Sequence, residues 1–372
     1  MSGNPLRQLQ DYGQSIWLDD LDRTLLSSGE LERMVSEDGL RGVTSNPSIF
    51  NEAISESKTY DPVIRELGSQ GKSAEEIYKA LVVEDVRWAA DLLREVYDRS
   101  GGDHGYVSLE VNPHLAYLTQ ETVVEARELW AALDRPNVFI NVPATRPGLP
   151  AIRTLIDEGI NVNVTLLFGL PRYRAVAEAY IAGLEDRSAA GAPLGRVRSV
   201  ASFFLSRIDV LVDPELEKAA GGGGPGSEAA RWLRGRVAVA SAKLAYRIYQ
   251  EIFAGNRFAA LAGRGASTQR VLWASTSAKN PEYSDVKYVE ALIGPDTINT
   301  VPRKTLDAFR DHGRAAASLE EGVAEAERVM DLLPEAGIDI DRVTQQLEEE
   351  GVDKFNKPYD RLLEAIEKRK SS

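Results

Sequence analysis

Two carboxylates in this chain stand where acid and base chemistry could be divided between them. Asp19 ends the short apolar run Ile16–Asp19, and Glu110 ends the run Tyr106–Glu110. Because side chains alternate between the two faces of a strand, each carboxylate lies on the face opposite to the aliphatic residues of its run. If one enclosed site holds both, their surroundings can move their pKa values apart and give one the role of acid and the other that of base.

Further strand-like runs repeat this alternation and add amide and hydroxyl groups. In Asn161–Leu166 the aliphatic side chains, Leu166 included, are predicted to face outward, whereas Asn161, Asn163 and Thr165 face inward. The run Leu272–Ser275 follows the same rule, with Trp273 and Ser275 predicted inward and Leu272 and Ala274 outward.

A single inward polar residue is most simply a buried group that a neighbour satisfies. Across five or six strands that explanation weakens, because each imperfectly paired polar group costs about 1–3 kcal/mol to bury. The set therefore favours a functional lumen.

Such residues need a scaffold that gathers many strand ends. Short apolar runs alternate with longer segments that carry apolar residues at helical spacing, such as Glu121–Leu133 and Arg172–Asp186. Repeated strand–helix units over about 250–300 residues favour a closed parallel barrel with its reactive residues at the carboxyl ends of the strands. The eight predicted strands are Ser15–Asp20, Arg41–Asn46, Tyr106–Val111, Asn137–Val142, Asn161–Phe168, Arg198–Leu205, Arg270–Thr276 and Thr297–Val301.

We therefore predict an α/β fold, a single (β/α)8 TIM barrel with extra N- and C-terminal helices. Residues 1–372 form one domain, with the barrel at about 15–310 and a helical cap at about 311–372. The crossover after the second strand holds two helical patterns. The crossover after the sixth contains Gly221–Gly224, Pro225 and Gly226, expected to be a flexible surface loop because no phosphate-binding glycine motif is present, and then a helical run from Ser227 to Phe253.

The cap is predicted to consist of three helices. They are Ser318–Leu333, Asp341–Glu350 and Val352–Lys368, with Gly337 and Gly351 as helix stops.

Composition excludes several classes of function. The hydrophobic fraction of 43% and charged fraction of 27% are those of a soluble globular protein, and a net charge of −13 argues against nucleic-acid binding. No apolar run approaches the roughly 20 residues that cross a bilayer, and the N-terminus has no signal-peptide pattern. Cysteine is absent, and the three histidines lack metal-ligand spacing. We expect a cytoplasmic protein with no cofactor, metal, membrane or nucleic-acid partner; whether it forms a homo-oligomer is open.

Blocks spread over about residues 10–310 resemble the transaldolases, in that family's order, and the chain is most similar to the longer bacterial type. Each block alone is only moderately specific. The blocks are Ile16-Trp-Leu-Asp-Asp-Leu, Gly42-Val-Thr-Ser-Asn-Pro-Ser-Ile-Phe, Val107-Ser-Leu-Glu-Val, Asn137-Val-Phe-Ile-Asn-Val-Pro-Ala-Thr145, Pro143-Ala-Thr-Arg-Pro-Gly-Leu-Pro-Ala-Ile, Ile160-Asn-Val-Asn-Val-Thr-Leu-Leu-Phe, Ser199-Val-Ala-Ser-Phe-Phe-Leu-Ser-Arg, Leu272-Trp-Ala-Ser-Thr-Ser, Lys279-Asn-Pro and Thr297-Ile-Asn-Thr-Val-Pro.

The resemblance implies a transferase of the pentose phosphate pathway whose partners are sugar phosphates. Transaldolases move a three-carbon dihydroxyacetone unit, so that sedoheptulose 7-phosphate and glyceraldehyde 3-phosphate become erythrose 4-phosphate and fructose 6-phosphate. A lysine amine forms a Schiff base with the ketose, and the protonated imine is the electron sink for the carbanion.

The resemblance also implies roles for single residues. Asp19 matches the acid/base carboxylate, and Glu110 and Thr165 match the pair that positions a catalytic water. Substrate hydroxyls match Asn46, Asn163 and Ser202; Phe204 packs against the site; Arg207 and Ser275 match phosphate binders, with Lys279 as a supplementary cation. A structural alternative for Arg207 is a salt bridge to Asp209 or Glu215.

At the position of the family's Schiff-base lysine this chain has Asn141. An amide nitrogen is not a nucleophile, since its lone pair is delocalised into the carbonyl, so Asn141 cannot form an imine. Three explanations stay open. The position is altered in an otherwise active enzyme; the barrel uses carboxylate acid/base chemistry that needs no imine; or the protein binds sugar phosphates without turning them over.

Lys279 offers a fourth route, as a replacement nucleophile just beyond the seventh strand. Relatives carry a lysine there beside their catalytic one, so the resemblance favours a phosphate partner.

Overall fold

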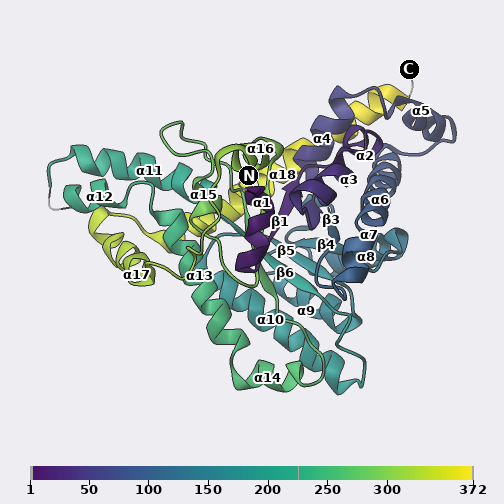
Figure 1. Cartoon of the computed structure of the whole chain (residues 1–372). Coiled ribbons are helices and arrows are strands. Elements are labelled where there is room, and N and C mark those ends of the chain that lie inside the picture. The colour runs from purple at the N-terminus through teal and green to yellow at the C-terminus, as the bar shows by residue number, and fades with distance from the viewer. Residues whose placement is uncertain (1–2, 225, 371–372) are drawn as a thin grey trace.

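Eight parallel strands close into a barrel in sequential order in the computed structural model, which describes residues 3–224 and 226–370 (Figure 1). This confirms the predicted (β/α)8 barrel with additional helices, and each predicted strand begins and ends within two residues of the observed one. The strands are β1 (Gln14–Asp19), β2 (Gly42–Thr44), β3 (Tyr106–Glu110), β4 (Val138–Pro143), β5 (Val162–Leu167), β6 (Ser199–Phe204), β7 (Arg270–Ala274) and β8 (Thr297–Val301).

Barrel closure depends on β1, which pairs with β2 on one side and with β8 on the other. Trp17 of β1 points into the barrel, where its ring stacks on Phe139 at a centroid distance of 6.2 Å. A Cβ atom at Gly42 would lie 2.4 Å from the Trp17 indole, so only glycine lets β2 pass beside that ring.

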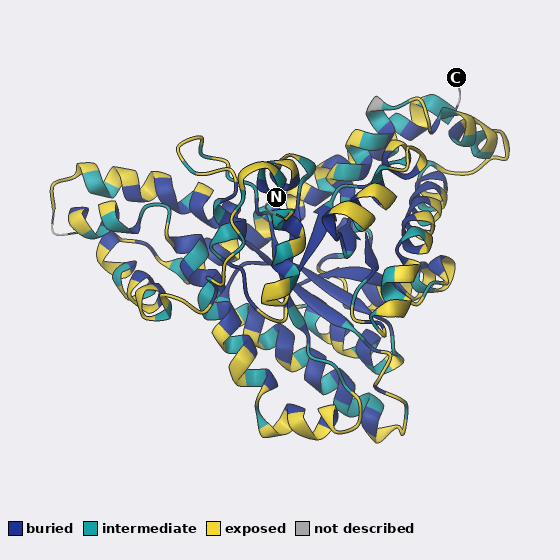
Figure 2. Cartoon of the chain, in the orientation of Figure 1, coloured by how far each residue is buried: buried dark blue, intermediate teal, exposed yellow. Residues whose placement is uncertain are grey.

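Helices cover the outside of the strands, whose residues are almost all buried, while the outer faces of the helices are exposed (Figure 2). The crossover between β2 and β3 holds four helices rather than the two predicted. The α-helices that precede β7 are α1 (Pro5–Gln8), α2 (Arg23–Ser27), α3 (Glu30–Arg33), α4 (Pro47–Glu56), α5 (Asp61–Ser69), α6 (Ala74–Leu92), α7 (Arg94–Arg99), α8 (Thr119–Leu133), α9 (Gly148–Glu158), α10 (Leu170–Ala189), α11 (Ser206–Gly221), α12 (Ser227–Leu233), α13 (Val237–Phe253) and α14 (Asn256–Ala262).

The predicted single run from Ser227 to Phe253 is two helices, α12 and α13. Gly235 between them has a φ of 71°, a left-handed conformation that ends a helix. Of the predicted glycine loop, Gly222–Gly224 follow α11 without forming a helix, and Pro225 lies outside the described residues.

The C-terminal segment differs most from its prediction. After α15 (Lys287–Glu290), α16 (Arg303–His312) and α17 (Val323–Leu332), one continuous helix, α18, runs from Ile340 to Lys370. Gly337 ends the short 3-10 turn before it with a φ of 80°, as predicted, but the prediction that Gly351 stops a helix was wrong. Gly351 is buried inside α18, at the place where that helix crosses the barrel.

The helix α18 spans the carboxyl-end mouth of the barrel. It contacts α4, α5 and α6 from the long β2–β3 crossover, α11 after β6, and the end of β5. In Figure 1 it is the long yellow helix that runs toward α4 and α5. No helix in the described part of the chain is long and apolar enough to span a membrane.

Candidate functional site

A polar cavity of about 230 Å3 opens at the carboxyl ends of the strands. All the residues predicted for the site line it, although they come from seven strands or the loops after them and from α11. These residues are Asp19, Asn46, Glu110, Asn141, Asn163, Thr165, Ser202, Phe204, Arg207, Ser275 and Lys279.

The strand register explains why the central residues meet. In neighbouring parallel strands, residues in register point to the same face. Glu110 of β3 pairs with Asn141 of β4, and Asn141 pairs with Asn163 of β5. Three polar side chains therefore stand side by side across the wall of the lumen.

Glu110 is the centre of the first hydrogen-bond group. Its two carboxyl oxygens accept from the Thr165 hydroxyl at 2.9 Å and from the Asn141 amide nitrogen at 3.0 Å. Burial raises the pKa of Glu110 to about 7 by disfavouring the charged form, although both hydrogen bonds act in the opposite direction. Glu110 can therefore give or take a proton near neutral pH.

Asn141 is held in place by its amide nitrogen, which also lies 3.4 Å from the Ser45 carbonyl oxygen. Its own amide oxygen is buried and has no hydrogen-bond partner within the described residues. The base of the cavity thus presents an amide with a free acceptor, and β4 supplies no amine.

Asp19 forms a second group on the other side of the lumen. One of its oxygens accepts from the Thr44 hydroxyl at 2.7 Å, and Thr44 also contacts the Thr300 hydroxyl at 2.7 Å. Burial raises the pKa of Asp19 to about 6, against the Thr44 hydrogen bond, which lowers it. Two carboxyl groups of similar pKa thus line one cavity, and each accepts a hydrogen bond from a threonine hydroxyl.

Arg207, Lys279 and Ser275 form the cationic end of the cavity. The Arg207 guanidinium lies over the Phe204 ring, 5.3 Å from its centroid, and its Nη1 is buried without a hydrogen-bond partner in the described chain. Ser275 shares a hydrogen bond with the Ser206 hydroxyl at 2.9 Å. The Lys279 amine donates to Ser277 at 2.6 Å; burial, then the charge of Arg207, lowers the pKa of Lys279.

The salt bridge considered for Arg207 does not form. Asp209 accepts instead from Lys287 and Tyr288, both at 2.8 Å, and no ion pair joins Arg207 to Glu215 within residues 3–224 and 226–370. The Arg207 charge remains available to the cavity.

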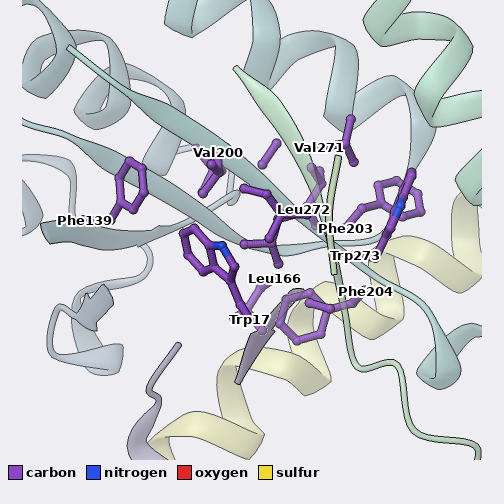
Figure 3. Close-up of a cluster of buried hydrophobic side chains, with 14 of the residues drawn as sticks. Trp17, Phe139, Leu166, Val200, Phe203, Phe204, Val271, Leu272 and Trp273 are labelled. Carbon is purple, nitrogen blue, oxygen red and sulfur yellow. The ribbon is translucent and has the colours of Figure 1, made fainter. Parts of the chain in front are cut away.

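Predicted side-chain directions were wrong for Leu272, Trp273 and Ala274 on β7 and for Leu166 on β5; Ala274, predicted outward, lines the cavity. Leu272 is in register with Ser202 and faces the lumen, whereas Trp273 faces the helices and contacts Phe203 edge-on at 6.4 Å (Figure 3). Ser275 still reaches the cavity because its φ of 54° turns the chain at the end of β7.

Leu166 has a φ of 53° at an irregularity in the β5–β6 pairing and so leaves the outward face predicted for it. It lies against Gly351 of α18, since a Cβ atom there would be 3.0 Å from the Leu166 Cδ2. Alternation alone could not indicate the side-chain directions on β7 or at Leu166, because a residue with a left-handed backbone interrupts the alternation.

The remaining substrate-side residues also take part in local structure. Asn46 caps α4, because its side-chain oxygen accepts from the Ser48 and Ile49 amides at 3.0 and 3.2 Å. The Asn163 side-chain oxygen accepts from Ser202 at 2.7 Å. The amide nitrogens of Asn46 and Asn163 are left to donate to a ligand.

Several residues of the cavity wall were missed from the sequence. Thr44 and Thr300 could have been found, because they end strands that flank Asp19. Phe355 could not, because it comes from α18, and nothing local indicates that this helix crosses the mouth. The missed residues are Thr44, Ser45, Ser48, Ala274, Ser277, Thr300, Pro302 and Phe355.

Comparison with known proteins places this geometry in a family. The model of the transaldolase/fructose-6-phosphate aldolase family matches residues 16–366. The chain is 48% identical over 362 residues to transaldolase of Saccharopolyspora erythraea, covering 97% of this chain and 96% of that protein. It is 48% identical over 365 residues to transaldolase of Thermobifida fusca, covering 98% of each. It is 49% identical over 363 residues to transaldolase of Thiobacillus denitrificans, covering 98% of this chain and 99% of that protein.

Proposed function

The chain belongs to the transaldolase/fructose-6-phosphate aldolase family, and from this premise we propose that its cavity is a transaldolase-type site for phosphorylated ketoses in which Asn141 has replaced the imine-forming amine. The reaction assigned to the scaffold is transfer of a dihydroxyacetone unit from sedoheptulose 7-phosphate to glyceraldehyde 3-phosphate. The observation that carries the proposal is the hydrogen bond from the Asn141 amide to Glu110 in the middle of an otherwise complete polar wall.

The substrate phosphate binds at the cationic end of the cavity. Arg207 supplies a planar guanidinium suited to two-point contact with phosphate, and Lys279 and Ser275 add a charge and a hydroxyl. The unpaired Nη1 of Arg207 supports this role, because a buried donor without a partner costs free energy until a ligand accepts from it.

The two carboxyl groups take the proton transfers. Asp19 handles the proton of the hydroxyl that leaves or arrives, and Glu110 with Thr165 positions water. The raised pKa values of about 6 and about 7 support both roles, since a general acid or base works best with a pKa near the operating pH.

Without an amine at position 141 the carbanion has no imine to receive its electron pair. Hydrogen bonds from Asn141 cannot replace a covalent electron sink, so the imine route is closed and only binding and positioning remain from the classical mechanism.

Asn141→Lys tests the proposal. A coupled assay with fructose 6-phosphate and erythrose 4-phosphate is run on the parent chain, on Asn141→Lys and on Asn163→Lys. The last variant puts an amine on the register neighbour of Asn141 and serves as a matched control. We expect turnover only from Asn141→Lys. Absence of turnover in all three folded proteins would contradict the proposal and favour a protein that binds sugar phosphates without turning them over.

Borohydride reduction in the presence of fructose 6-phosphate, followed by mass mapping, examines the covalent step directly. We expect a reduced adduct on residue 141 of the lysine variant and none on the parent chain. An adduct on Lys279 of the parent chain would instead identify that lysine as a replacement nucleophile.

The paired carboxyl groups also favour a second candidate, an enolisation or isomerisation that needs no imine. Glu110, with its pKa of about 7, would remove a proton next to the ketose carbonyl, and Asp19 would protonate the carbonyl oxygen. Exchange of fructose 6-phosphate carbon-bound protons in deuterated water, followed by NMR, tests this candidate. Exchange by the parent chain that disappears in Glu110→Gln would support it.

A further inference from the structure

A second cavity, of about 330 Å3, lies at the opposite end of the barrel and shares no lining residue with the candidate site. Its walls come from the amino ends of the strands. Three arginines line it: Arg41 precedes β2, Arg198 precedes β6, and Arg270 begins β7.

Neutral groups hold the guanidinium of Arg41. It donates to Gln10 at 2.6 Å and to the His104 Nε2 at 3.0 Å. Because a guanidinium can only donate, the Nε2 must accept, and the ring proton therefore sits on Nδ1, which donates to Ser15 at 3.1 Å. His104 is neutral, and burial together with the charges of Arg270 and Arg41 lowers its pKa to about 3.

The other two arginines are also poorly neutralised. Arg270 donates to the backbone carbonyl of Asp103 at 2.5 Å, and Arg198 reaches the Asp103 carboxylate only at 3.5 Å. The Nε of Arg198 is buried and has no hydrogen-bond partner in the described residues. The only carboxylates in the cavity wall are Asp103 and Asp296, which are exposed.

Two partly buried arginines elsewhere in this protein, unlike Arg207, have close carboxylate partners. Arg23 lies 2.9 Å from Asp85, and Arg310 lies 2.7 Å from Asp38. Neither Arg41 nor Arg270 has an ion pair within 4.0 Å in residues 3–224 and 226–370. Unpaired charge in a poorly solvated site is costly. The three arginines therefore need an anion, and the described chain does not provide one.

We propose that this amino-end cavity binds a small phosphate monoester or free phosphate between Arg41, Arg198 and Arg270. Guanidinium groups match the oxygens of a tetrahedral anion by bidentate contact. Thr268 accepts a hydrogen bond from Tyr249 at 3.0 Å, so its own hydroxyl proton is free to donate to the ligand. The volume lies at the small end of ligand pockets, which suits a phosphate with a short carbon skeleton.

Orthophosphate titration separates this site from the mouth of the barrel. In a phosphate-free buffer, calorimetry is run on Arg207→Gln, which removes the guanidinium at the mouth, and on the same variant carrying a second change. We expect Arg207→Gln to keep one saturable site. Adding Arg270→Gln should weaken it about tenfold or more, whereas adding Arg196→Gln should not. Arg196 is an exposed arginine two residues from Arg198 that does not line the cavity.

Loss of all phosphate binding in Arg207→Gln alone would overturn the inference without affecting the proposed function. The unaltered chain gives a test that does not depend on variants folding. Orthophosphate should slow phenylglyoxal modification of Arg41 and Arg270 relative to Arg196, as followed by mass mapping. Equal modification rates with and without phosphate would also overturn it. If glycerol 3-phosphate also protects these arginines from phenylglyoxal and glycerol does not, the site binds phosphate esters as well as free phosphate.

Discussion

Asn141 and Glu110 share a hydrogen bond, and each limits the chemistry of the other. The amide donates to a carboxyl group that burial keeps close to half-protonated at neutral pH. A lysine at position 141 would place a cation beside Glu110 and lower its pKa, because an opposite charge favours the ionised form. The residue at position 141 therefore determines both the covalent route and the protonation state of the carboxyl group next to it.

Replacing Glu110 by glutamine should change how stability depends on pH. The pKa of Glu110 is about 7 in the folded protein and 4.5 for an ordinary glutamate. The folded state therefore binds more protons between these values, and the contribution of Glu110, present below pH 4.5, is lost as pH rises through about 7. We expect Glu110→Gln to be more stable than the parent at pH 8 by roughly 3 kcal/mol and about equal at pH 4.

Urea unfolding followed by circular dichroism from pH 4 to pH 8.5 measures this difference. The exposed residue Glu121 provides the matched control, and Glu121→Gln should follow the parent at every pH. A Glu110→Gln curve parallel to the parent curve would show that Glu110 titrates alike in the folded and unfolded chain.

Removing the Arg207 charge should affect the phosphate group more than the sugar. We expect Arg207→Gln to weaken fructose 6-phosphate binding about tenfold or more while leaving the weak binding of fructose unchanged, because only the phosphate uses the guanidinium. Calorimetry with both ligands measures the difference. Arg146→Gln, a change at an exposed arginine that does not line the cavity, should match the parent. Equal losses of affinity for fructose 6-phosphate and fructose would show that Arg207 does not contact the phosphate.

At the scale of elements, Gly351 sets how closely α18 crosses the barrel. A Cβ atom there would lie 3.0 Å from Leu166 Cδ2 and 3.7 Å from Arg207 Nη1. Gly351→Ala should be nearly neutral, since alanine favours the helix by up to about 1 kcal/mol and the contacting methyl can shift. In Gly351→Leu the larger side chain has no room between α18 and the barrel. This change should lower both the melting temperature and the affinity for fructose 6-phosphate.

Thermal unfolding and fructose 6-phosphate titration measure both effects. Asp353→Leu serves as the control, because it introduces the same side chain on the exposed side of the same helix. It should leave the affinity for fructose 6-phosphate unchanged. Full affinity in Gly351→Leu would mean that α18 does not constrain Arg207.

The sequence predicted elements well where local pattern decides them. All eight strands were found because alternation and turn residues lie within each run. The direction of Trp273 was missed because the left-handed backbone of Ser275 breaks the alternation at the end of β7. Gly351 was misread as a stop because its role is a close approach to Leu166, a contact between residues far apart in the chain.

At the scale of the whole molecule, α18 acts as part of the core. Its buried face includes Leu347, Val352, Phe355, Leu362 and Ile366. We expect a chain ending at Asp339 to be largely insoluble and its soluble fraction to bind the dye ANS, because the surfaces that α18 covers become exposed. A chain ending at Lys370 is the control and should behave as the parent. A soluble, cooperatively melting chain ending at Asp339 would contradict this expectation.

The residues that line the site were easier to predict from the sequence than the helix that covers it. Asp19 and Glu110 follow from their positions at the carboxyl ends of β1 and β3, because a parallel barrel brings all those ends together. The family resemblance added Arg207, Lys279 and the significance of Asn141. Phe355 and the path of α18 depend on packing between segments far apart in the chain, which no local pattern records.

The last helix also bears on synthesis. Chains emerge from the ribosome N-terminus first, and domains fold as their residues become available. Because Phe355 belongs to the cavity wall and α18 ends at Lys370, a nascent chain with a closed barrel still has an unfinished pocket. Sugar phosphates should therefore meet a complete binding site only after the α18 segment has been synthesised and has packed across the barrel.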